Sequence, residues 1–425
     1  MVGRFAVGCE GTHGVFPRCN LTCSPCYHSR DANKVRTDGT HTLRAVAAQM
    51  AFLRERRGER GHAQLIGGEV SLLDPDDHAA VLQVMRDYGR EPMSMTHGDF
   101  DYDYLQRLAL DADGRARFGR LSMAAHFDSL MRGRRGIPRP SHELELTAYR
   151  RRFAEMFERL RREHGVRSYL AHNMTVTPAN LDQVEAVTSS VVPMGYSMLS
   201  FQPAAFVGDD RRWREGFRDV SPDAVWNAVE RGVGARLPHS VLQMGHPACN
   251  RTAYGFMVGD RWVPFLDDRV AADLRVRDLF LEHMSGVVLG GVPSWVAAGR
   301  VLRIAVRHPG AAAAAIGLGR RLLVRAGGPM AVARGPVRPM TFVMHSFMDA
   351  ADVRPAWDLL RAGVASDDAR IREVQERLQS CVYAMAHPDT NELVPACVQH
   401  SVLDAEENRA LRTLLPLIEV RTAAL

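Results

Sequence analysis

Short apolar and β-branched segments alternate with longer amphipathic segments through the first half of this 425-residue chain. The short segments predict strands, and the longer ones place apolar residues at the spacing of one helix face. The predicted strands lie near 3–8, 62–66, 92–96, 120–126, 167–176 and 196–203, and the predicted helices near 42–57, 76–88, 101–111, 143–164 and 178–190. Alternation of this kind predicts a parallel sheet with helical crossovers. Six such units indicate an α/β fold, a partial (β/α)6 TIM-like barrel with an α+β C-terminal extension.

The second half of the chain has a less regular pattern. Residues 221–234 predict a helix with Ser221 as N-cap and Pro222 at its first position. Two hairpins are predicted, one over 254–265 turned at Gly259-Asp260 and one over 380–397 turned at 389–391. We therefore divide the chain into a barrel (1–220), a connecting helix and hairpin (221–283), a basic apolar segment (284–340) and a C-terminal α+β region (341–425).

Composition and charge narrow the cellular setting. Hydrophobic residues make up 46% of the chain, which can supply a substantial core. The formal net charge is +5, but Lys34 is the only lysine, so the arginine excess indicates a GC-rich genome and no nucleic-acid partner is expected. The N-terminus shows no secretory pattern, and the seven cysteines are an odd number, which predicts reduced thiols in the cytoplasm. No apolar run reaches the length of a spanning helix.

Three cysteines, Cys19, Cys23 and Cys26, follow the first predicted strand with the spacing C-x3-C-x2-C. This pattern suits an iron–sulfur cluster with one iron left open to a small-molecule ligand. A structural zinc ion is an alternative, with further ligands available at Cys9, His13 and His28. A redox pair of Cys23 and Cys26 is a second alternative, but it leaves Cys19 without a role.

Other polar residues follow the remaining strands. Gly67, Gly68 and Glu69 come directly after the second strand. His126 and Asp128 with Ser122 are assigned to the end of the fourth strand, Asn173 and Thr175 to the fifth, and Gln202 to the sixth. Because loops at the carboxyl ends of barrel strands carry the chemistry, these side chains are candidates for one site. Each has a structural alternative, since polar side chains at strand ends also satisfy backbone groups.

The cysteine motif after the first strand and G-G-E after the second resemble the radical S-adenosylmethionine (SAM) superfamily over about residues 3–210. The resemblance implies a [4Fe–4S] cluster on Cys19, Cys23 and Cys26, with SAM bound at the open iron. It implies reductive cleavage of SAM to a 5′-deoxyadenosyl radical, which removes a hydrogen atom from an unactivated carbon. A reductase such as flavodoxin or ferredoxin is the implied electron donor.

The same resemblance assigns contacts to the cofactor. Glu69 is implied to accept a hydrogen bond from the methionyl ammonium, and Gly67 and Gly68 let the backbone approach SAM. The family has a bulky residue before the third cysteine where this chain has Pro25, followed after the cysteine by Tyr27, so the adenine contact is assigned to these positions. Further implied cofactor contacts are Ser122, Asn173, Thr175 and Gln202, and the candidate catalytic residues are His126 and Asp128.

The remaining cysteines suggest a second cluster. Radical SAM enzymes often carry auxiliary iron–sulfur clusters in C-terminal extensions, and Cys249, Cys381 and Cys397 are the implied ligands here, with Cys9 or a histidine available as a fourth. We expect the terminal hairpin to place Cys381 and Cys397 at opposite ends of one ribbon, facing the same pocket. The alternative is three unconnected buried thiols.

Residues 284–340 contain eight arginines and no acidic residue. The arginines at 300, 303 and 307, and those at 321 and 325, recur at helical spacing among apolar residues. This pattern predicts helices that lie on an anionic membrane surface. The alternative is a core helix pair whose arginines extend to solvent.

The order of these segments weakly resembles lipid-acting, tetraether-synthase-like radical SAM proteins. Our leading hypothesis is therefore an oxidoreductase of the radical SAM class, peripheral on the inner face of the membrane, that modifies a lipid or isoprenoid. A peptide or protein maturase of the same superfamily is the first alternative. A non-catalytic iron–sulfur or zinc-binding scaffold is the second.

Overall fold

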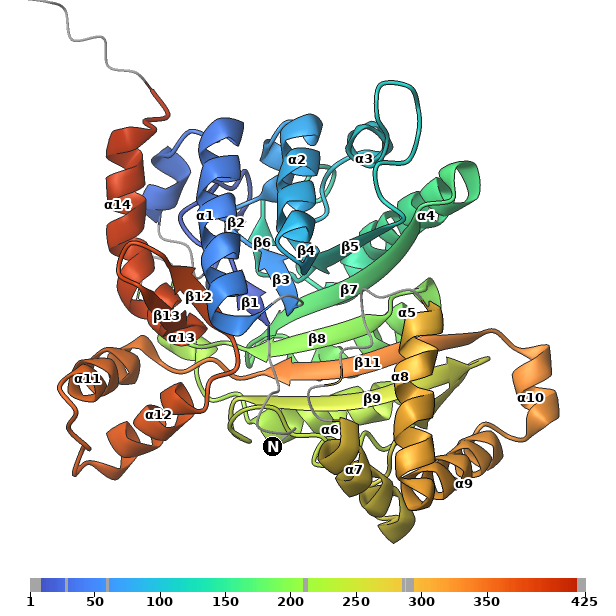
Figure 1. Ribbon diagram of the computed structural model, residues 1–425. Helices are drawn as coiled ribbons and strands as arrows, with labels where there is room; N and C mark the ends of the chain where they lie inside the picture. Colours follow the sequence, from blue (N-terminus) through green and yellow to red (C-terminus); the bar gives the residue numbers. More distant parts are fainter. Residues whose placement is uncertain are drawn as a thin grey trace, which may run out of the picture.

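An 11-stranded sheet, with the strand order β10-β9-β11-β8-β7-β5-β4-β3-β1-β12-β13, forms the centre of the molecule (Figure 1). The computed structural model describes residues 9–26, 30–58, 61–208, 213–284, 287 and 294–418. Within these ranges, the first half of the chain contributes six strands to this sheet: β1 (Glu10–Gly11), β3 (Gly61–Leu65), β4 (Arg90–Thr96), β5 (Arg120–His126), β7 (Arg167–Val176) and β8 (Met198–Pro203). Five of these confirm predicted strands, whereas the strand predicted near 3–8 lies outside the described residues.

Two strands from the second half extend the parallel part of the sheet. β11 (Val337–His345) pairs with β8, and β12 (Ala384–His387) pairs with β1, both in parallel. The antiparallel strands β9 (Asn250–Val258), β10 (Arg261–Pro264) and β13 (Glu392–Pro395) occupy the two edges. The chain therefore has the predicted mixed α/β architecture, a largely parallel sheet that alternates with helices as in a partial barrel.

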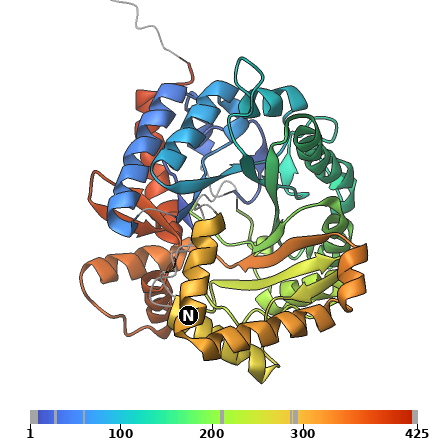
Figure 2. The same ribbon diagram turned by 45° about the vertical axis from the view of Figure 1, so that its right-hand side comes forward.

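Helices cover the outer face of this curved sheet (Figure 2). They are α1 (Gly39–Arg57), α2 (Pro75–Asp87), α3 (Tyr102–Ala109), α4 (Thr147–His164), α5 (Val184–Val191) and α6 (Pro222–Val233). Alternation along the strands sets the two faces, since Leu121, Met123 and Ala125 of β5 belong to the core under the helices. The alternate residues of β5, including His126 at its end, therefore face the inside of the barrel. The first predicted helices are confirmed, and Ser221 caps α6 as expected.

The second half adds helices around the barrel. They are α7 (Ala271–Met284), α8 (Ser294–Arg307), α9 (Pro309–Arg325), α10 (Pro329–Arg334), α11 (Ala350–Arg361), α12 (Ala369–Gln379), α13 (Ala396–Val398) and α14 (Asp404–Leu414). Short 3-10 helices are η1 (Arg30–Lys34), η2 (Val70–Leu72), η3 (Glu143–Leu146), η4 (Leu181–Gln183), η5 (Val192–Met194) and η7 (Glu215–Phe217), and the π-helix η8 covers Gln399–Leu403. Both predicted hairpins are confirmed, as β9–β10 and β12–β13. Helices α7 to α10 lie apart from the helices that cover β3 to β5 (Figure 1).

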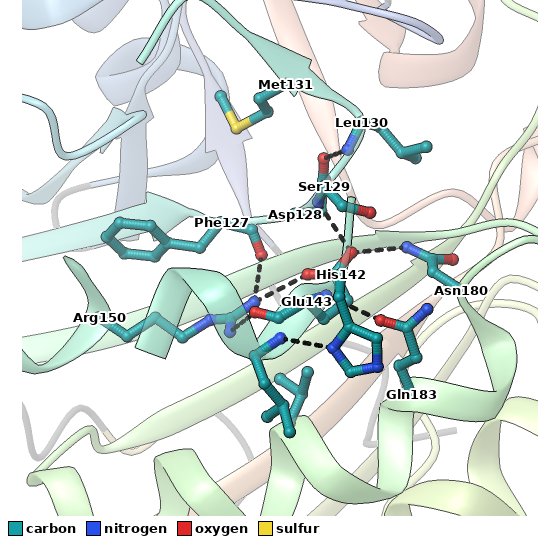
Figure 3. Close-up of polar contacts among 12 residues, drawn as sticks. Phe127, Asp128, Ser129, Leu130, Met131, His142, Glu143, Arg150, Asn180 and Gln183 are labelled. Atoms are coloured by element: carbon teal, nitrogen blue, oxygen red, sulfur yellow. Dashed lines mark hydrogen bonds and ion pairs between the residues drawn. The ribbon is translucent and has the colours of Figure 1, made fainter. Parts of the chain in front are cut away.

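A buried ion pair fixes the loop that follows β5. Nη2 of Arg150 on α4 donates to Oε2 of Glu143 at 2.9 Å, and both side chains are fully buried. Arg150 also donates to the backbone oxygens of Glu143 and Phe127, and Oε1 of Glu143 accepts from Ser129 N and Asn180 Nδ2 (Figure 3). The pair thus connects α4 to the segment that carries Asp128.

Candidate functional site

The cysteine loop is held in place by backbone pairing that the sequence pattern did not indicate. Strand β2 (Thr22–Cys23) pairs antiparallel with β6 (Met131–Arg132), so Cys23 lies opposite Met131. Ser24 N donates to Leu130 O at 3.4 Å, and Cys19 N donates to the side chain of Asn33 at 2.9 Å. The loop is therefore fixed against the segment that follows β5.

The three thiols of this loop lie close together. The pKa of Cys23 is raised well above its ordinary value, first by a hydrogen bond with Cys26 and then by burial and by the charges of Cys26, Asp128 and Cys19. Such mutual effects require thiols within electrostatic reach of one another. Within the described ranges, the compact three-ligand groups that fit a single metal ion do not include this trio. Three neighbouring thiols suit a cluster that carries its own positive charge, which would deprotonate them.

The G-G-E loop packs directly on the chain that leads into the cysteine loop. Gly68 N donates to Phe16 O at 2.7 Å, and Glu69 N donates to Arg18 O at 2.8 Å. A Cβ atom at Gly68 would lie 2.0 Å from Arg18 O, and one at Gly67 would lie 2.7 Å from the ring of Phe16. Glycine is therefore required for this close approach of two backbones. Contact of either glycine with SAM stays a prediction.

Glu69 joins three loops through its buried carboxylate. Oε1 accepts from Thr96 Oγ1 at 2.6 Å and from Ser71 N at 3.0 Å, and Oε2 accepts from His97 N at 2.7 Å. Nε2 of His97 in turn donates to Asn20 Oδ1 at 2.7 Å, beside the first cysteine. Sequence reasoning missed Thr96, His97 and Asn20 as partners. The structure gives Glu69 a positioning role, and its contact with a methionyl ammonium is not tested.

His126 and Asp128 form an ion pair that faces the cysteine loop. His126 Nε2 and Asp128 Oδ2 are 2.6 Å apart, and Asp128 also accepts from the backbone of Thr175 and Leu130. Burial lowers the pKa of His126, but the charge and hydrogen bond of Asp128 outweigh it, and the charge of Cys26 adds to the net rise. Burial likewise raises the pKa of Asp128, but the charge of His126 produces a net fall. The pair therefore favours the protonated form of the His126 imidazole beside the thiols.

The pH dependence of this pair gives the first prediction. The contribution of His126 to the stability of the folded state is complete below the ordinary histidine pKa of 6.5. It is lost as the pH rises through the raised pKa that His126 has in the folded protein. The Asp128→Asn substitution removes the charge that raises the pKa of His126, whereas burial still lowers it. We therefore expect the pKa of His126 in this variant to fall below that of the wild type. An NMR titration of the histidine Cε1–H signals measures this. Asp76→Asn, an exposed change on α2, should leave the His126 curve in place, and an unchanged curve in Asp128→Asn contradicts the assignment.

The structure shows which of the remaining predicted residues lie at the carboxyl ends of their strands. Pairing puts His126 beside Asn173 and Thr175 beside Gln202, so these four lie on the inner face at the carboxyl edge. Ser122 was wrongly placed at the strand end, because it is the third residue of β5 and lies about 13 Å along the strand from His126.

Two further positions bear on the adenine contact. Pro25 is described and half-buried in the cysteine loop, whereas Tyr27 lies outside the described residues. The same holds for His28, a zinc candidate. The adenine contact therefore stays a prediction for both Pro25 and Tyr27.

The three cysteines of the second half lie within electrostatic reach of one another, but they are not among the compact three-ligand groups of the described residues. Burial raises the pKa of Cys397 to about 12, and the charges of Cys381 and Cys249 act in the same direction. Arg377, which sequence reasoning missed, donates from Nε to the sulfur of Cys249 at 3.3 Å. Burial and the charge of Cys249 also raise the pKa of Cys381. A shared site for the three thiols therefore stays a prediction, and so does the alternative of three unconnected buried thiols.

The expected geometry of the terminal hairpin was wrong in one respect. Ala384 pairs with Pro395, and the turn at 389–391 closes the other end of the ribbon. Cys381 and Cys397 therefore both lie at the open end of the hairpin instead of at opposite ends. The length of the hairpin therefore does not separate the two cysteines.

A cavity of about 470 Å³ opens beside the carboxyl ends of β8 and β11. Its lining combines apolar and aromatic side chains with a few charged groups: Ala204, Phe206, Trp213, Phe347, Arg218 and Asp349. Arg218 donates to Asp349 at 2.6 Å, which fixes one polar wall. The volume and lining are typical of a small-molecule or side-chain site.

Comparisons with known proteins find partial structural similarity at low sequence identity. No protein-family model matches the chain, and no curated protein matches it. The structure of SuiB from Streptococcus suis bound to S-adenosylmethionine matches 46% of this chain and 40% of that chain, at 14% identity and a TM-score of 0.31. The structure of anSMEcpe with bound AdoMet and the Cp18Cys peptide matches 52% of this chain and 57% of that chain, at 13% identity and a TM-score of 0.36. The chain thus spans about half the length of these structures.

Proposed function

We propose that this chain is a radical SAM enzyme. The observation that supports the proposal is the convergence of Cys19, Cys23 and Cys26 beside the His126–Asp128 pair and the G-G-E loop, all at the carboxyl edge of a partial barrel. When bound by these cysteines, a [4Fe–4S] cluster with SAM would supply one electron for cleavage of the sulfonium bond and then a hydrogen-abstracting radical. The experiment is anaerobic reconstitution followed by an assay of 5′-deoxyadenosine release with SAM and a reductant.

The chain's own residues would position the reactants and exclude water. Glu69 connects the G-G-E loop to the end of β4 by a hydrogen bond, and His97 connects the end of β4 to the cysteine loop. Hydrogen bonds therefore hold these three segments together. The imidazole of His126 offers a donor on the inner face, suited to a ribose hydroxyl or a polar substrate group. Asp128 holds that ring and keeps its charge.

A second cluster is part of the proposal. Cys249, Cys381 and Cys397 supply three thiols, and Arg377 supplies a positive charge next to Cys249. A nearby cation stabilises thiolates and would support ligation. A fourth ligand is not assigned.

The substrate class is proposed from the surface of α8 and α9. Trp295, Leu302 and Val306 of α8 are 77%, 64% and 73% exposed, and they share one face with Arg303 and Arg307. Ile316, Leu323 and Val324 of α9 are also exposed. Exposed apolar side chains interleaved with arginines are typical of helices at an anionic lipid surface. This favours a lipid or isoprenoid substrate delivered from the membrane.

Part of the basic segment has a different role from the one predicted. Arg321 and Arg325 of α9 form ion pairs with Asp273 of α7, whose carboxylate is fully buried. They hold two helices together and are therefore not available to a membrane surface. Every helix in the described ranges is too short or too polar to cross a bilayer.

Vesicle flotation tests the membrane contact. We expect wild-type protein to float with phosphatidylglycerol-containing vesicles and an Arg303→Gln/Arg307→Gln variant to bind about 30-fold more weakly, at about 1 kcal/mol per arginine. The matched control is Arg159→Gln/Arg161→Gln, which removes two exposed arginines from α4. Equal binding of both double variants, or equal binding to pure phosphatidylcholine, contradicts the proposal.

The peptide-maturase alternative concerns the same chemistry on another substrate. Two compared proteins carry peptides in their structures, SuiB with a precursor peptide and anSMEcpe with Cp18Cys. The polar and aromatic lining of the cavity near β8 is the observation in this chain that fits a peptide side chain. Transfer of deuterium into 5′-deoxyadenosine from a deuterated lipid or from a deuterated peptide separates the two substrate classes. A non-catalytic scaffold releases no 5′-deoxyadenosine.

A further inference from the structure

Two histidines and a glutamate converge in a group that the proposed function does not use. Nδ1 of His13 lies 2.9 Å from Oε2 of Glu407, and Nδ1 of His387 lies 3.8 Å from Oε1 of the same carboxylate. One ligand atom from each of the three residues lies within 4.8 Å of the other two. His13 follows β1, His387 ends β12 and Glu407 belongs to α14, so distant parts of the chain meet here.

The other nitrogen of each ring already has a hydrogen-bond acceptor. Nε2 of His13 lies 2.7 Å from the backbone oxygen of Ala386, and Nε2 of His387 lies 2.5 Å from Oε1 of Gln399. The Gln399 amide is oriented by its own donation to Glu407 and to Asp404, which leaves its oxygen for His387. With Nε2–H donating to these oxygens, a neutral ring directs the lone pair of Nδ1 at the carboxylate. Burial lowers the pKa of His13, but the hydrogen bond and charge of Glu407 produce a net rise, so a proton on Nδ1 is the alternative to a metal ion.

Two imidazole nitrogens and a carboxylate that face one another need a positive charge between them, which either a proton on His13 or a metal ion supplies. Hydrogen bonds from the outer ring nitrogen to a carbonyl or amide oxygen are the contacts that orient metal-binding imidazoles. Two histidines with one carboxylate and open positions are a set that divalent transition metals use. Ligands about 2.1 Å from one ion and at right angles to each other lie about 3 Å apart, which the His13–Glu407 separation of 2.9 Å matches. The His387–Glu407 separation is 3.8 Å and the two rings stack with centroids 4.0 Å apart, so the imidazole of His387 has to turn toward the ion when it binds.

We propose that His13, His387 and Glu407 bind one divalent transition-metal ion of the zinc or iron(II) type. The three side chains are 12%, 12% and 25% exposed, so the ion can enter from solvent and water can complete its coordination. Because its ligands come from the segment after β1, from β12 and from α14, the ion fastens the C-terminal hairpin and helix to the chain that follows the first strand. It thereby stabilises the strand that leads into the cysteine loop.

Zinc binding to Glu407→Gln tests the site. This variant keeps the shape of the side chain and a partner for Gln399 while it removes the charged ligand. We expect wild-type protein to retain one more Zn²⁺ per chain than Glu407→Gln after gel filtration, and the affinity of His387→Ala to be at least 10-fold weaker. All variants keep the seven cysteines, so any zinc that the thiols bind contributes equally to the zinc content of every variant.

The control is His62→Ala, which removes an exposed histidine near the amino end of β3. It should bind as much zinc as the wild type. Zn²⁺ should also raise the melting temperature of the wild type and of His62→Ala but not that of Glu407→Gln, a readout that does not depend on SAM cleavage. Equal zinc content and equal melting shifts in wild type and Glu407→Gln overturn the proposal and leave a proton-bridged hydrogen-bond group.

Discussion

Replacing Cys23 with alanine is expected to abolish release of 5′-deoxyadenosine, with a loss of at least about 1,000-fold against the reconstituted wild type. Cys23 lies at the centre of the trio, because its pKa responds to Cys26, Asp128 and Cys19. Two thiolates cannot hold a cubane cluster that already leaves one iron open. Electron delivery to SAM then has no carrier, so the loss follows from chemistry and not from reduced affinity.

The matched control for this change lies one residue away. Ser24→Ala alters the same loop, but it keeps the backbone bond from Ser24 N to Leu130 O and all three thiols. We expect it to keep the cluster and its absorption near the wild-type level. If Cys23→Ala retains activity, or if Ser24→Ala loses as much, the loop does not hold the cluster that we propose.

Iron analysis of the same variants tests the second cluster. With two cubane clusters the wild type should hold about eight iron atoms per chain and Cys23→Ala about four. Cys381→Ala should show the reverse loss, keeping the first cluster and its SAM cleavage while the auxiliary iron is lost. About four iron atoms in the wild type contradict an auxiliary cluster without affecting the first proposal.

Local sequence patterns predicted the elements whose signals lie within a few residues. The helix after Ser221 has the expected bounds and the hairpin has the expected turn at Gly259-Asp260, because a cap and a turn act locally. The first strand of that hairpin begins four residues earlier than predicted, at Asn250. The spacing of the cysteines and their position after the first strand were also sufficient to assign the candidate cluster site. These features needed no knowledge of which strand pairs with which.

Long-range partners were the part that the sequence did not reveal. The parallel pairing of β11 with β8 and of β12 with β1 joins segments more than 100 residues apart, and no local pattern specifies such partners. The same reason explains Arg321, whose acidic partner Asp273 lies outside the acid-free segment that suggested a membrane surface. It also explains why the hydrogen bonds of Glu69 to Thr96 and His97 were missed.

Removal of one partner from the buried ion pair is expected to have the largest effect on stability. Arg150 and Glu143 are both fully buried, so Arg150→Met leaves a carboxylate in the core with its charge uncompensated. We expect the free energy of unfolding to fall by about 3–5 kcal/mol. Urea denaturation followed by near-UV circular dichroism measures the change. Arg159→Met removes an arginine from an exposed pair on the same helix and should cost less than about 1 kcal/mol.

A double variant separates the charge from the packing. In Glu143→Gln/Arg150→Met the buried carboxylate is replaced by a neutral amide whose oxygen still accepts from Ser129 N. If the uncompensated charge causes the loss, the double variant is more stable than Arg150→Met alone, because the neutral amide costs less to bury. Equal stability of the single and double variants would assign the loss to the bonds from Arg150 to the backbone oxygens of Phe127 and Glu143 instead. Either change loosens the segment that carries Asp128, so SAM binding should weaken along with stability.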